Sequence, residues 1–441
     1  MGIKSKILCA AAATVSAVLC FSACGGGGGS ASTGDSKSSE NSSKESVSAP
    51  AREYHNYPVY DAVDFSLDLW QKQEVKYCPE YNRKEEDCNI KGIFLRSDYK
   101  GEESYAFGYL GVPEGTKEED DKPAVLLIHG GGGTAYYQWV REWNDRGYVA
   151  LALDMEGHIP KESGTVDNGP ADLYVKSEYP APHNQNYADA DNLPVEETWM
   201  YYAVSTAIRG NSFLRKLAYV DKDKVGICGI SWGGVITSIT SGYDDRFAFS
   251  IPIYCTLNNY GSTGNIPSYY VNHANALVWD DDTGLAAVNT PILFLAGIND
   301  VNQAPHTVSK TASHCKNARI SLVKGFLHSH GHAIGRNEPF AFADEIVFGK
   351  KTMVTFESNE LGASEKTVKI NVPEGVTVAK SGLVSTDGEG LTGASGWEVN
   401  SFKSDSSTIA YELPEGKTTY YYFYVETSDG LITSTLIAEN K

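Results

Sequence analysis

Short, almost wholly apolar runs recur through the middle of the chain, separated by longer segments of mixed polarity. These runs lie at residues 124–128, 148–153, 224–228, 247–254, 291–297 and 319–323. A continuous apolar run of this length is typical of a parallel strand that is buried on both faces. Strands that alternate with helices imply a sheet covered on both sides, so the pattern predicts an α/β fold with a mostly parallel, doubly wound sheet.

The segments between these runs have the periodicity of helices. Tyr136, Val140 and Trp143 recur at helical spacing within residues 135–146. We expect them to face the sheet, because an amphipathic helix buries its apolar stripe. Residues 196–217 are interpreted as a further helix.

Two long segments lack a clear period and are predicted to be loops over the carboxyl edge of the sheet. Residues 155–194 are rich in Pro, Asn and Asp, and residues 254–285 carry a group of aromatic side chains. These rings either stack on sugars or pack an irregular loop, and the sequence favours neither interpretation. They belong to Tyr260, Tyr269, Tyr270, His273 and Trp279.

The pattern changes after Gly349, where short β-rich runs are separated by Gly, Asp and Ser. Such runs predict a small all-β sandwich of the immunoglobulin-like kind over residues 351–441. The most β-prone run lies at residues 419–425. No planar aromatic platform is visible in this segment, so packing or spacing is favoured over polysaccharide binding.

The N-terminal residues have the layout of an export signal. Lys4 and Lys6 precede an apolar run at residues 7–21, which is too short for a comfortable membrane span, and small residues follow ahead of Cys24. Residues 24–50 are rich in Gly and Ser and predict a flexible tether. The predicted organisation is a signal peptide at 1–23, the tether at 24–50, an α/β catalytic domain at 51–350 and the β-sandwich at 351–441.

The net charge bears on possible partners, and the cysteine content bears on possible disulfides. The formal net charge of -19 disfavours a nucleic-acid partner, because no basic patch remains to neutralise phosphates. Only Cys78 and Cys88 are near enough in sequence to suggest a local disulfide, and Cys228 is expected to be a small buried hydrophobe. The odd number of cysteines that remains beyond Cys24 argues against a full disulfide framework.

The most informative motif is Gly-Ile-Ser-Trp-Gly at residues 229–233, between the apolar run at 224–228 and a helix-like segment. A G-x-S-x-G sequence in this position predicts a nucleophile elbow. The turn is so tight that the flanking residues need almost no side chain, which Gly229 and Gly233 provide. Ser231 is therefore the candidate nucleophile, with its hydroxyl at the edge of the sheet.

A second motif, His-Gly-Gly-Gly-Gly at residues 129–133, directly follows the apolar run at 124–128. Glycines let backbone amides turn toward the negative charge of a tetrahedral intermediate. We expect the amides of Gly131, Gly132 and Trp232 to form the oxyanion hole. The alternatives are a flexible turn or a phosphate cradle, but neither a G-K-[ST] sequence nor a dinucleotide fingerprint accompanies these glycines.

A serine nucleophile requires a base and a group that orients the base. Asp300 follows the run at residues 291–297 and His328 follows the run at 319–323, which puts both at the carboxyl ends of strands. The order Ser, Asp, His is that of an elbow-type triad. Asp154 ends another predicted strand and is the rival acid, but Asp300 is preferred because its strand immediately precedes that of the histidine.

Three histidines, His328, His330 and His332, stand close together on one predicted loop. His328 is preferred as the base because it is nearest to the strand end, and His332 and then His330 are the alternatives. Such a cluster can also bind a metal, but its spacing lacks a carboxylate pattern such as H-E-x-x-H, so zinc is the lesser interpretation. We therefore expect neither a metal nor a cofactor.

These motifs together resemble those of the α/β-hydrolases, over residues 54–349. Within that superfamily the chain is similar to the branch of acetylxylan esterases and dienelactone hydrolases, which borders on the prolyl-oligopeptidase-type peptidases. The resemblance implies ester hydrolysis through a covalent acyl-serine. It departs from the peptidases because no long N-terminal propeller and no anchor for a peptide's amino terminus are evident.

Phe21-Ser22-Ala23-Cys24 resembles a bacterial lipobox, although leucine is commoner where Phe21 stands. This resemblance implies cleavage before Cys24 and attachment of lipid to its sulfur, with simple secretion as the alternative. The sequence thus predicts an extracytoplasmic, membrane-anchored serine hydrolase acting on small acyl esters of small molecules or polysaccharides. A serine peptidase and a non-catalytic surface binding protein on the same fold are the alternatives.

Overall fold

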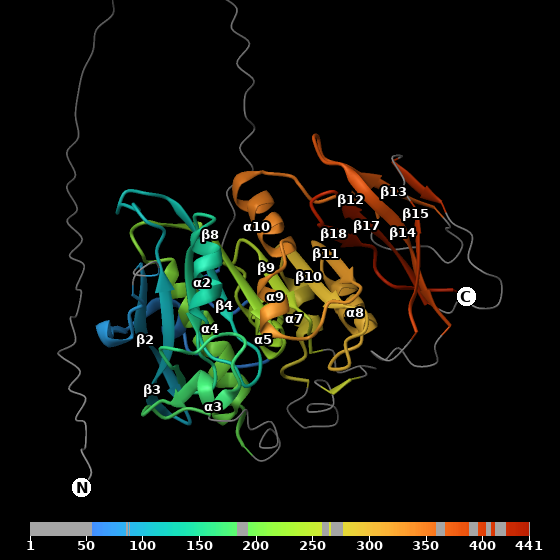
Figure 1. Cartoon of the computed structure of the whole chain (residues 1–441). Helices are drawn as coiled ribbons and strands as arrows, with labels where there is room; N and C mark the ends of the chain where they lie inside the picture. The colour runs from blue at the N-terminus through green and yellow to red at the C-terminus, as the bar shows by residue number, and fades with distance from the viewer. Residues whose placement is uncertain are drawn as a thin grey trace, which may run out of the picture. The chain divides into compact units, whose positions relative to one another are not determined.

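One large mixed sheet runs through the described part of the chain, and Ser231, Asp300 and His328 each follow one of its strands (Figure 1). In the computed structural model its central strands are parallel neighbours in the order β5 (Val149–Leu153), β4 (Lys122–Ile128), β8 (Val220–Ile230), β9 (Ser250–Ile253), β10 (Ile292–Gly297) and β11 (Ala318–Val323). Each apolar run of the sequence coincides with one of these strands. The predicted mostly parallel sheet is confirmed.

The structure describes residues 55–84, 87, 89–182, 193–257, 264–265, 277–358, 367–387, 396–402, 407–410 and 420–440. Among these residues we find no helix with the length and hydropathy of a membrane span. The predicted export signal, Cys24 and the tether lie outside the described residues, and so does Cys88. The lipid anchor and the local disulfide therefore stay predictions.

Helices cover both faces of the sheet. On one face lie α2 (Tyr137–Asn144) and α10 (Glu338–Phe348), and on the other lie α4 (Trp199–Leu214), α5 (Trp232–Tyr243), α7 (Asp281–Ala287) and α8 (Pro305–His314). The rings of Trp143 on α2 and Phe340 on α10 pack with their centroids 4.6 Å apart. Tyr136, Val140 and Trp143 are all buried, so the inward-facing stripe predicted for this helix is confirmed.

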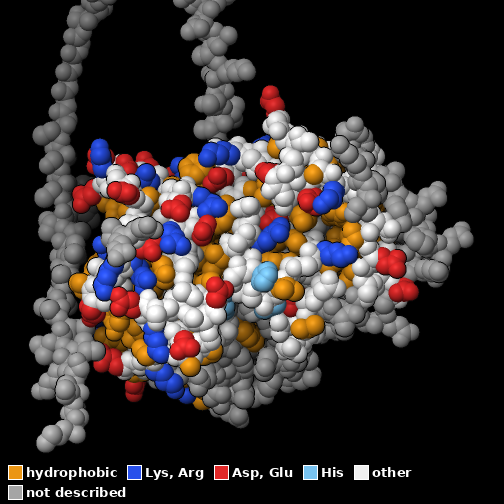
Figure 2. Space-filling view, in the orientation of Figure 1, with side chains coloured by type: hydrophobic (Ala, Val, Ile, Leu, Met, Phe, Trp, Pro, Cys, Tyr) orange, Lys and Arg blue, Asp and Glu red, His pale blue; other side chains and the backbone are white. Residues whose placement is uncertain are grey.

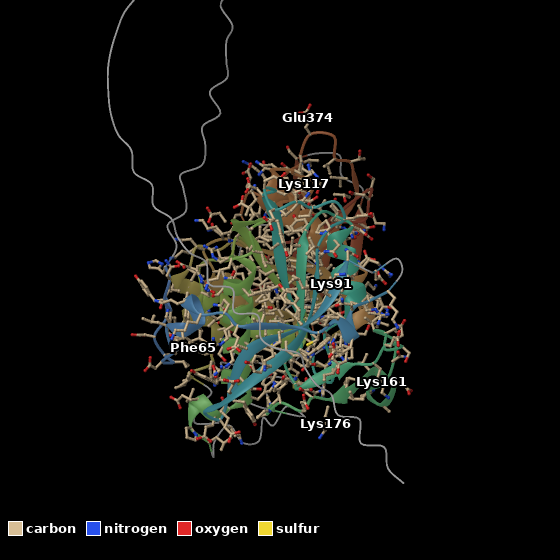
Figure 3. The ribbon with its side chains drawn as sticks, turned by 90° about the vertical axis from the view of Figure 1, so that its left-hand side faces the viewer. Phe65, Lys91, Lys117, Lys161, Lys176 and Glu374 are labelled. Carbon is tan, nitrogen blue, oxygen red and sulfur yellow. The ribbon has the colours of Figure 1, made fainter. Side chains whose placement is uncertain are left out.

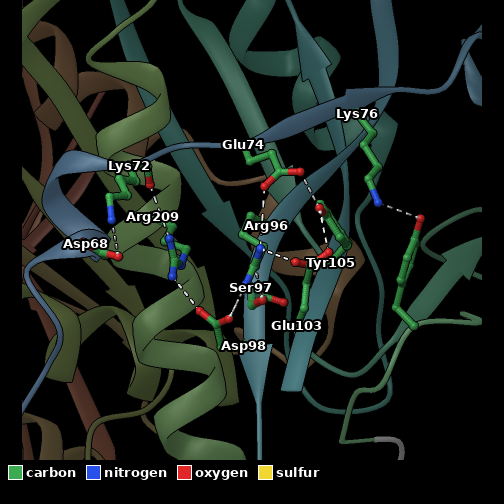
Figure 4. A network of polar contacts seen from close by, with 11 residues as sticks. Asp68, Lys72, Glu74, Lys76, Arg96, Ser97, Asp98, Glu103, Tyr105 and Arg209 are labelled. Carbon is green, nitrogen blue, oxygen red and sulfur yellow. Dashed lines mark hydrogen bonds and ion pairs between the residues drawn. The ribbon is translucent and has the colours of Figure 1, made fainter. Parts of the chain in front are cut away.

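Three antiparallel strands extend the sheet beyond β5. They are β3 (Glu102–Gly111), β2 (Ile90–Tyr99) and β1 (Val75–Tyr77). A polar network ties this edge to α4, because Arg209 donates to Asp98 Oδ2 at 2.5 Å (Figure 4). Phe65, seen from this side in Figure 3, lies just before the short helix α1 (Asp68–Gln71) and stacks on Tyr201 of α4. The N-terminal strands are thus fastened to the helical layer.

The segment predicted as a loop at residues 155–194 contains short elements that its weak periodicity does not predict. In its described part, β6 (His158–Pro160) pairs with β7 (Tyr174–Lys176), and the single-turn helix α3 (Pro170–Leu173) lies between them. The ring of His158 stacks on that of Tyr174, with centroids 3.6 Å apart. This hairpin follows β5 and so lies on the carboxyl side of the sheet.

The C-terminal strands continue the central sheet. β18 (Ile432–Ser434) pairs antiparallel with β11, with Ser434 opposite Ile320. Beyond it follow β17 (Tyr420–Thr427), β14 (Val378–Thr386) and β15 (Glu398–Phe402), and β19 (Ala438–Glu439) pairs with β17. The sheet therefore runs without interruption from the α/β part into the C-terminal part.

A second small sheet packs on these C-terminal strands. It consists of β12 (Thr355–Phe356), β13 (Thr367–Asn371) and β16 (Thr408–Ala410). Phe356 and Ile370 from this sheet pack with Leu383 and Phe423 from the larger one in a common core. The C-terminal β layers of the predicted fold class are confirmed, whereas the domain boundary near residue 350 stays a prediction.

Candidate active site

Ser231 lies at the end of β8, where the chain turns sharply into α5. Its φ of 58° and ψ of -118° put a non-glycine residue in a rarely populated conformation, which costs about 1–3 kcal/mol and is typical of functional sites. A Cβ atom on Gly229 would lie 2.1 Å from the carbonyl oxygen of Gly233, and one on Gly233 would lie 2.1 Å from that of Ile128. Only glycine fits at both positions, so the motif has the geometry of an elbow.

Ser231, His328 and Asp300 form one hydrogen-bonded series, although they are far apart in the chain. Ser231 Oγ lies 2.7 Å from His328 Nε2, and His328 Nδ1 lies 2.6 Å from Asp300 Oδ2. An ionised carboxylate only accepts hydrogen bonds, so the imidazole proton is on Nδ1 and Nε2 accepts the serine proton. The Asp300 carboxylate is further fixed because its Oδ1 accepts the amide proton of Asn302 at 2.8 Å.

The serine end of this series is open to solvent. Histidine side chains reach the surface near the middle of the face in Figure 2, where Figure 1 places α9 (His330–Ile334). Ser231 is partly exposed and His328 keeps 18% of its side chain exposed, whereas the side chain of Asp300 is completely buried. The nucleophile and the base thus keep some exposed surface, whereas the acid is buried.

Tyr254, at the end of β9, supports the imidazole and was not predicted from the sequence to do so. Its ring stacks on that of His328 with centroids 4.4 Å apart, and its hydroxyl donates to the carbonyl of Leu327 at 2.6 Å. Burial raises the pKa of Tyr254, so the hydroxyl stays a donor. Its φ of 72° is unusual for a non-glycine residue. The signal in the sequence was an aromatic residue ending the strand that follows the elbow helix.

The two alternative bases have other partners. His330 Nε2 accepts the amide proton of Gly130 at 2.9 Å, and burial lowers the pKa of this imidazole to about 3. His332 is exposed, and its Nδ1 lies 2.7 Å from the hydroxyl of Ser329 at the start of α9. Among the described contacts of Ser231, His328 supplies the imidazole.

Asp154, the rival acid, organises the turn that follows β5. Its Oδ1 accepts the amide protons of Glu156 at 2.9 Å and His158 at 2.7 Å. Burial acts to raise the pKa of this carboxyl, but hydrogen bonding and charge at His129 outweigh it and lower the pKa. Asp154 therefore supports the backbone beside the site, and the acid next to His328 is Asp300.

The glycines at residues 130–133 form a β-turn, called here the glycine turn. The amide of Gly133 donates to the carbonyl of Gly130 at 3.1 Å, and Gly132 has a φ of 70°. A positive φ at the third position is what a type II turn requires, which explains glycine there. A Cβ atom on Gly130 would lie 2.9 Å from the Cβ of Ser231, so the turn lies against the nucleophile.

The backbone amides of the three expected oxyanion donors differ in their hydrogen bonds and positions. The amide of Gly132 donates to Glu156 Oε1 at 3.0 Å, so it is already engaged. The amide of Gly131 has no hydrogen-bond partner within the described ranges. Trp232 opens α5 directly after Ser231. The contacts thus favour the amide of Gly131 over that of Gly132, and the role of Trp232 stays a prediction.

One group of carboxylates outside this site has ligand atoms close enough together for a metal ion. The side chains of Asp280, Asp281 and Asp282 are buried and offer oxygens within 4.8 Å of one another. Asp281 Oδ2 accepts from the hydroxyl of Ser238 and the amide of Leu257. Burial raises the pKa of the Asp281 carboxyl, with the two neighbouring acids acting in the same direction.

Comparison with known proteins agrees with this geometry. Residues 195–354, which include the serine, aspartate and histidine of the series, match the model of the prolyl oligopeptidase family. A probable dipeptidyl-peptidase 5 of Emericella nidulans is 29% identical over 138 residues, which is 30% of this chain and 16% of that protein. The chain thus matches only a small part of this relative's length.

Two solved structures of low sequence identity are also among the matches. An acetyl xylan esterase from Paenibacillus sp. R4 has 18% identity and a TM-score of 0.46, covering 63% of this chain and 90% of that one. An acylaminoacyl peptidase of Pyrococcus horikoshii has 18% identity and a TM-score of 0.43, covering 60% and 43%. The fold and the hydrogen-bonded series described above define the class: this is a serine hydrolase of the α/β-hydrolase type.

Proposed function

We propose that the protein hydrolyses carboxylic esters through an acyl-serine intermediate and that its substrates carry small acyl groups, such as acetyl, on carbohydrate. The observation that carries this proposal is the unbroken series from Ser231 through His328 to Asp300, at 2.7 and 2.6 Å. The choice of substrate rests on the resemblance of the sequence motifs to acetylxylan esterases.

In the first half of the reaction Ser231 Oγ attacks the ester carbonyl and His328 Nε2 takes its proton. Charge on the tetrahedral oxygen is held by the amides of Gly131 and Trp232. When the intermediate collapses, the bond to the alcohol breaks and the proton passes from Nε2 to the leaving oxygen. The acyl group is then bonded to Ser231.

In the second half, water attacks the acyl-serine while Nε2 accepts one of its protons. The second tetrahedral intermediate uses the same two amides. Its collapse releases the carboxylic acid and returns the proton to Ser231 Oγ. Asp300 stabilises the imidazolium that forms in both halves and keeps the proton of the neutral ring on Nδ1.

A peptidase is the second candidate, because residues 195–354 match a peptidase family. Side-by-side assays on one preparation distinguish the two. We expect an acetylated xylo-oligosaccharide to be cleaved with a kcat/KM at least about tenfold above that of an aminoacyl anilide, or about 1.4 kcal/mol in barrier. Feruloylated and longer acyl esters complete the panel. The opposite ranking supports the peptidase.

We further propose that the mature protein is an extracytoplasmic lipoprotein anchored through Cys24. The support is the order of basic, apolar and small residues ahead of this cysteine. In cells, Cys24→Ser should move the protein out of the detergent-extracted membrane fraction, whereas Cys78→Ser should leave it there. Equal membrane retention of both variants argues against the anchor.

A further inference from the structure

Two side chains from distant parts of the chain hold the glycine turn beside the nucleophile. His330, at the start of α9, accepts the amide proton of Gly130 at Nε2, 2.9 Å away. Glu156, in the segment after β5, accepts the amide proton of Gly132 at Oε1, 3.0 Å away. With the hydrogen bond that closes the turn, these contacts leave the amide of Gly131 without a partner among the described residues.

The turn and the imidazole fit closely together. A Cβ atom on Gly130 or on Gly133 would lie 3.0 Å from His330 Nε2 in either case. Glycine at these positions therefore makes room for the ring as well as for the backbone turn. Because α9 begins just after His328, the same segment that carries the imidazole beside Ser231 also holds the turn.

His330 holds the turn in its neutral form, because a protonated Nε2 accepts no hydrogen bond. The buried ring packs against Tyr136, whose hydroxyl lies 3.4 Å from Nδ1, and it interacts electrostatically with the imidazoles of His129 and His328. Burial, followed by the charges of these two imidazoles, lowers the pKa of His330 to about 3. The acceptor is therefore present throughout the neutral range of pH.

Glu156 holds the other side of the turn. The residue is only 2% exposed, and a hydrogen bond from an amide to a carboxylate is stronger than one between neutral groups. An amide that already donates to a negatively charged group is a poor donor for a second negative charge. This argument assigns the amide of Gly132 to the support of the turn.

We propose that His330 and Glu156 are positioning residues that fix the glycine turn, so that the amide of Gly131 is ready as its oxyanion donor. The inference rests on the proposed function, since it concerns the same tetrahedral intermediate. A donor fixed in advance needs no reorganisation when charge develops, and this is how an oxyanion hole accelerates acyl transfer.

Matched variants separate the loss of an acceptor from the loss of a side chain. His330→Ala and Glu156→Ala remove the acceptor, whereas His330→Gln and Glu156→Gln keep an acceptor oxygen at similar reach. We expect each alanine variant to lose about 10²–10³-fold in kcat toward an activated acetyl ester, the loss typical of one oxyanion donor, with little change in KM. Each glutamine variant should recover most of that loss.

Two further measurements accompany the kinetics. The rate at which a fluorophosphonate labels Ser231 should fall in parallel, because this reaction also places charge in the oxyanion hole. Circular dichroism and Tm report whether each variant folds. Folded alanine variants with wild-type kcat contradict the inference, as do glutamine variants that are as slow as the alanine ones.

If the alanine variants do not fold, the kcat values of His330→Gln and Glu156→Gln test the inference. A kcat near that of the wild type supports the inference, and a large loss in folded glutamine variants overturns it. The proposed function fails separately, if the wild-type protein neither hydrolyses any ester of the panel nor takes the label. In that case the positioning role proposed for His330 and Glu156 is rejected together with the proposed function.

Discussion

Replacing Ser231 by alanine is expected to lower turnover of an activated acetyl ester on the order of 10⁶-fold, the loss typical of a missing serine nucleophile. The base and the oxyanion donors remain in Ser231→Ala, but no acyl-serine can form. Hydrolysis of 4-nitrophenyl acetate, followed spectroscopically, measures the effect. Labelling by a fluorophosphonate should disappear together with it.

The control for this variant is a measurement of its thermal stability, which shows whether it is folded. Alanine removes only the hydroxyl oxygen from a side chain that already occupies the strained turn, so Tm should stay near that of the wild type. Undiminished turnover in a well-folded Ser231→Ala protein would falsify the acyl-serine mechanism. Failure of the wild-type protein to take the label, together with no measurable turnover, would instead favour a binding protein built on this fold.

Replacing His328 by alanine should be nearly as damaging, again on the order of 10⁶-fold in kcat. The serine hydroxyl then has no base at 2.7 Å to take its proton, and Asp300 has no imidazole to orient. Steady-state kinetics toward the same ester, with KM measured separately, quantifies the loss. A KM close to that of the wild type is expected, because the imidazole acts in the transition state.

His332→Ala is the matched control for this variant, since His332 is exposed on the same segment and its ring contacts Ser329. It should keep kcat close to that of the wild type. Full activity in His328→Ala, combined with a large loss in His332→Ala, contradicts the assignment of the base. Both variants are measured at several pH values, so that a shifted optimum is not mistaken for a lost base.

The sequence predicts the sheet and the catalytic series for one physical reason. A parallel strand that is buried on both faces has to be apolar throughout, so each central strand is visible as a continuous run. Ser231, Asp300 and His328 each follow such a run, and the carboxyl ends of parallel strands meet at one edge. Their proximity in the structure follows from that shared position.

The supporting residues are not predictable in this way. Tyr254 contacts His328 only because β9 lies between β8 and β10, and neighbour order in a sheet is not encoded in any one run. Glu156 and His330 act on backbone amides of a turn, which have no side-chain signature in the sequence. Glu156 also lies in a segment of weak periodicity, where local pattern carries little information.

The pairing of the C-terminal strands was not predictable from the sequence for the same reason. The β-rich runs after residue 350 predict a sandwich, but they do not reveal that β18 pairs with β11 of the α/β part. β18 is only a short strand, and its partner lies far away in the chain. Pairing of this kind depends on shape and on the edge that the α/β part leaves open.

The pairing of β18 with β11 covers an edge of the α/β part of the sheet, and it does so without a ligand. The outer side of β11 would otherwise present unpaired amides and carbonyls, which are a template for strands of other molecules. β18 occupies this rim, and the Ser434 hydroxyl even accepts the amide proton of Leu322 at 3.1 Å. β11 is therefore not an edge strand, and the edge of the sheet on this side lies at β15 within the described residues.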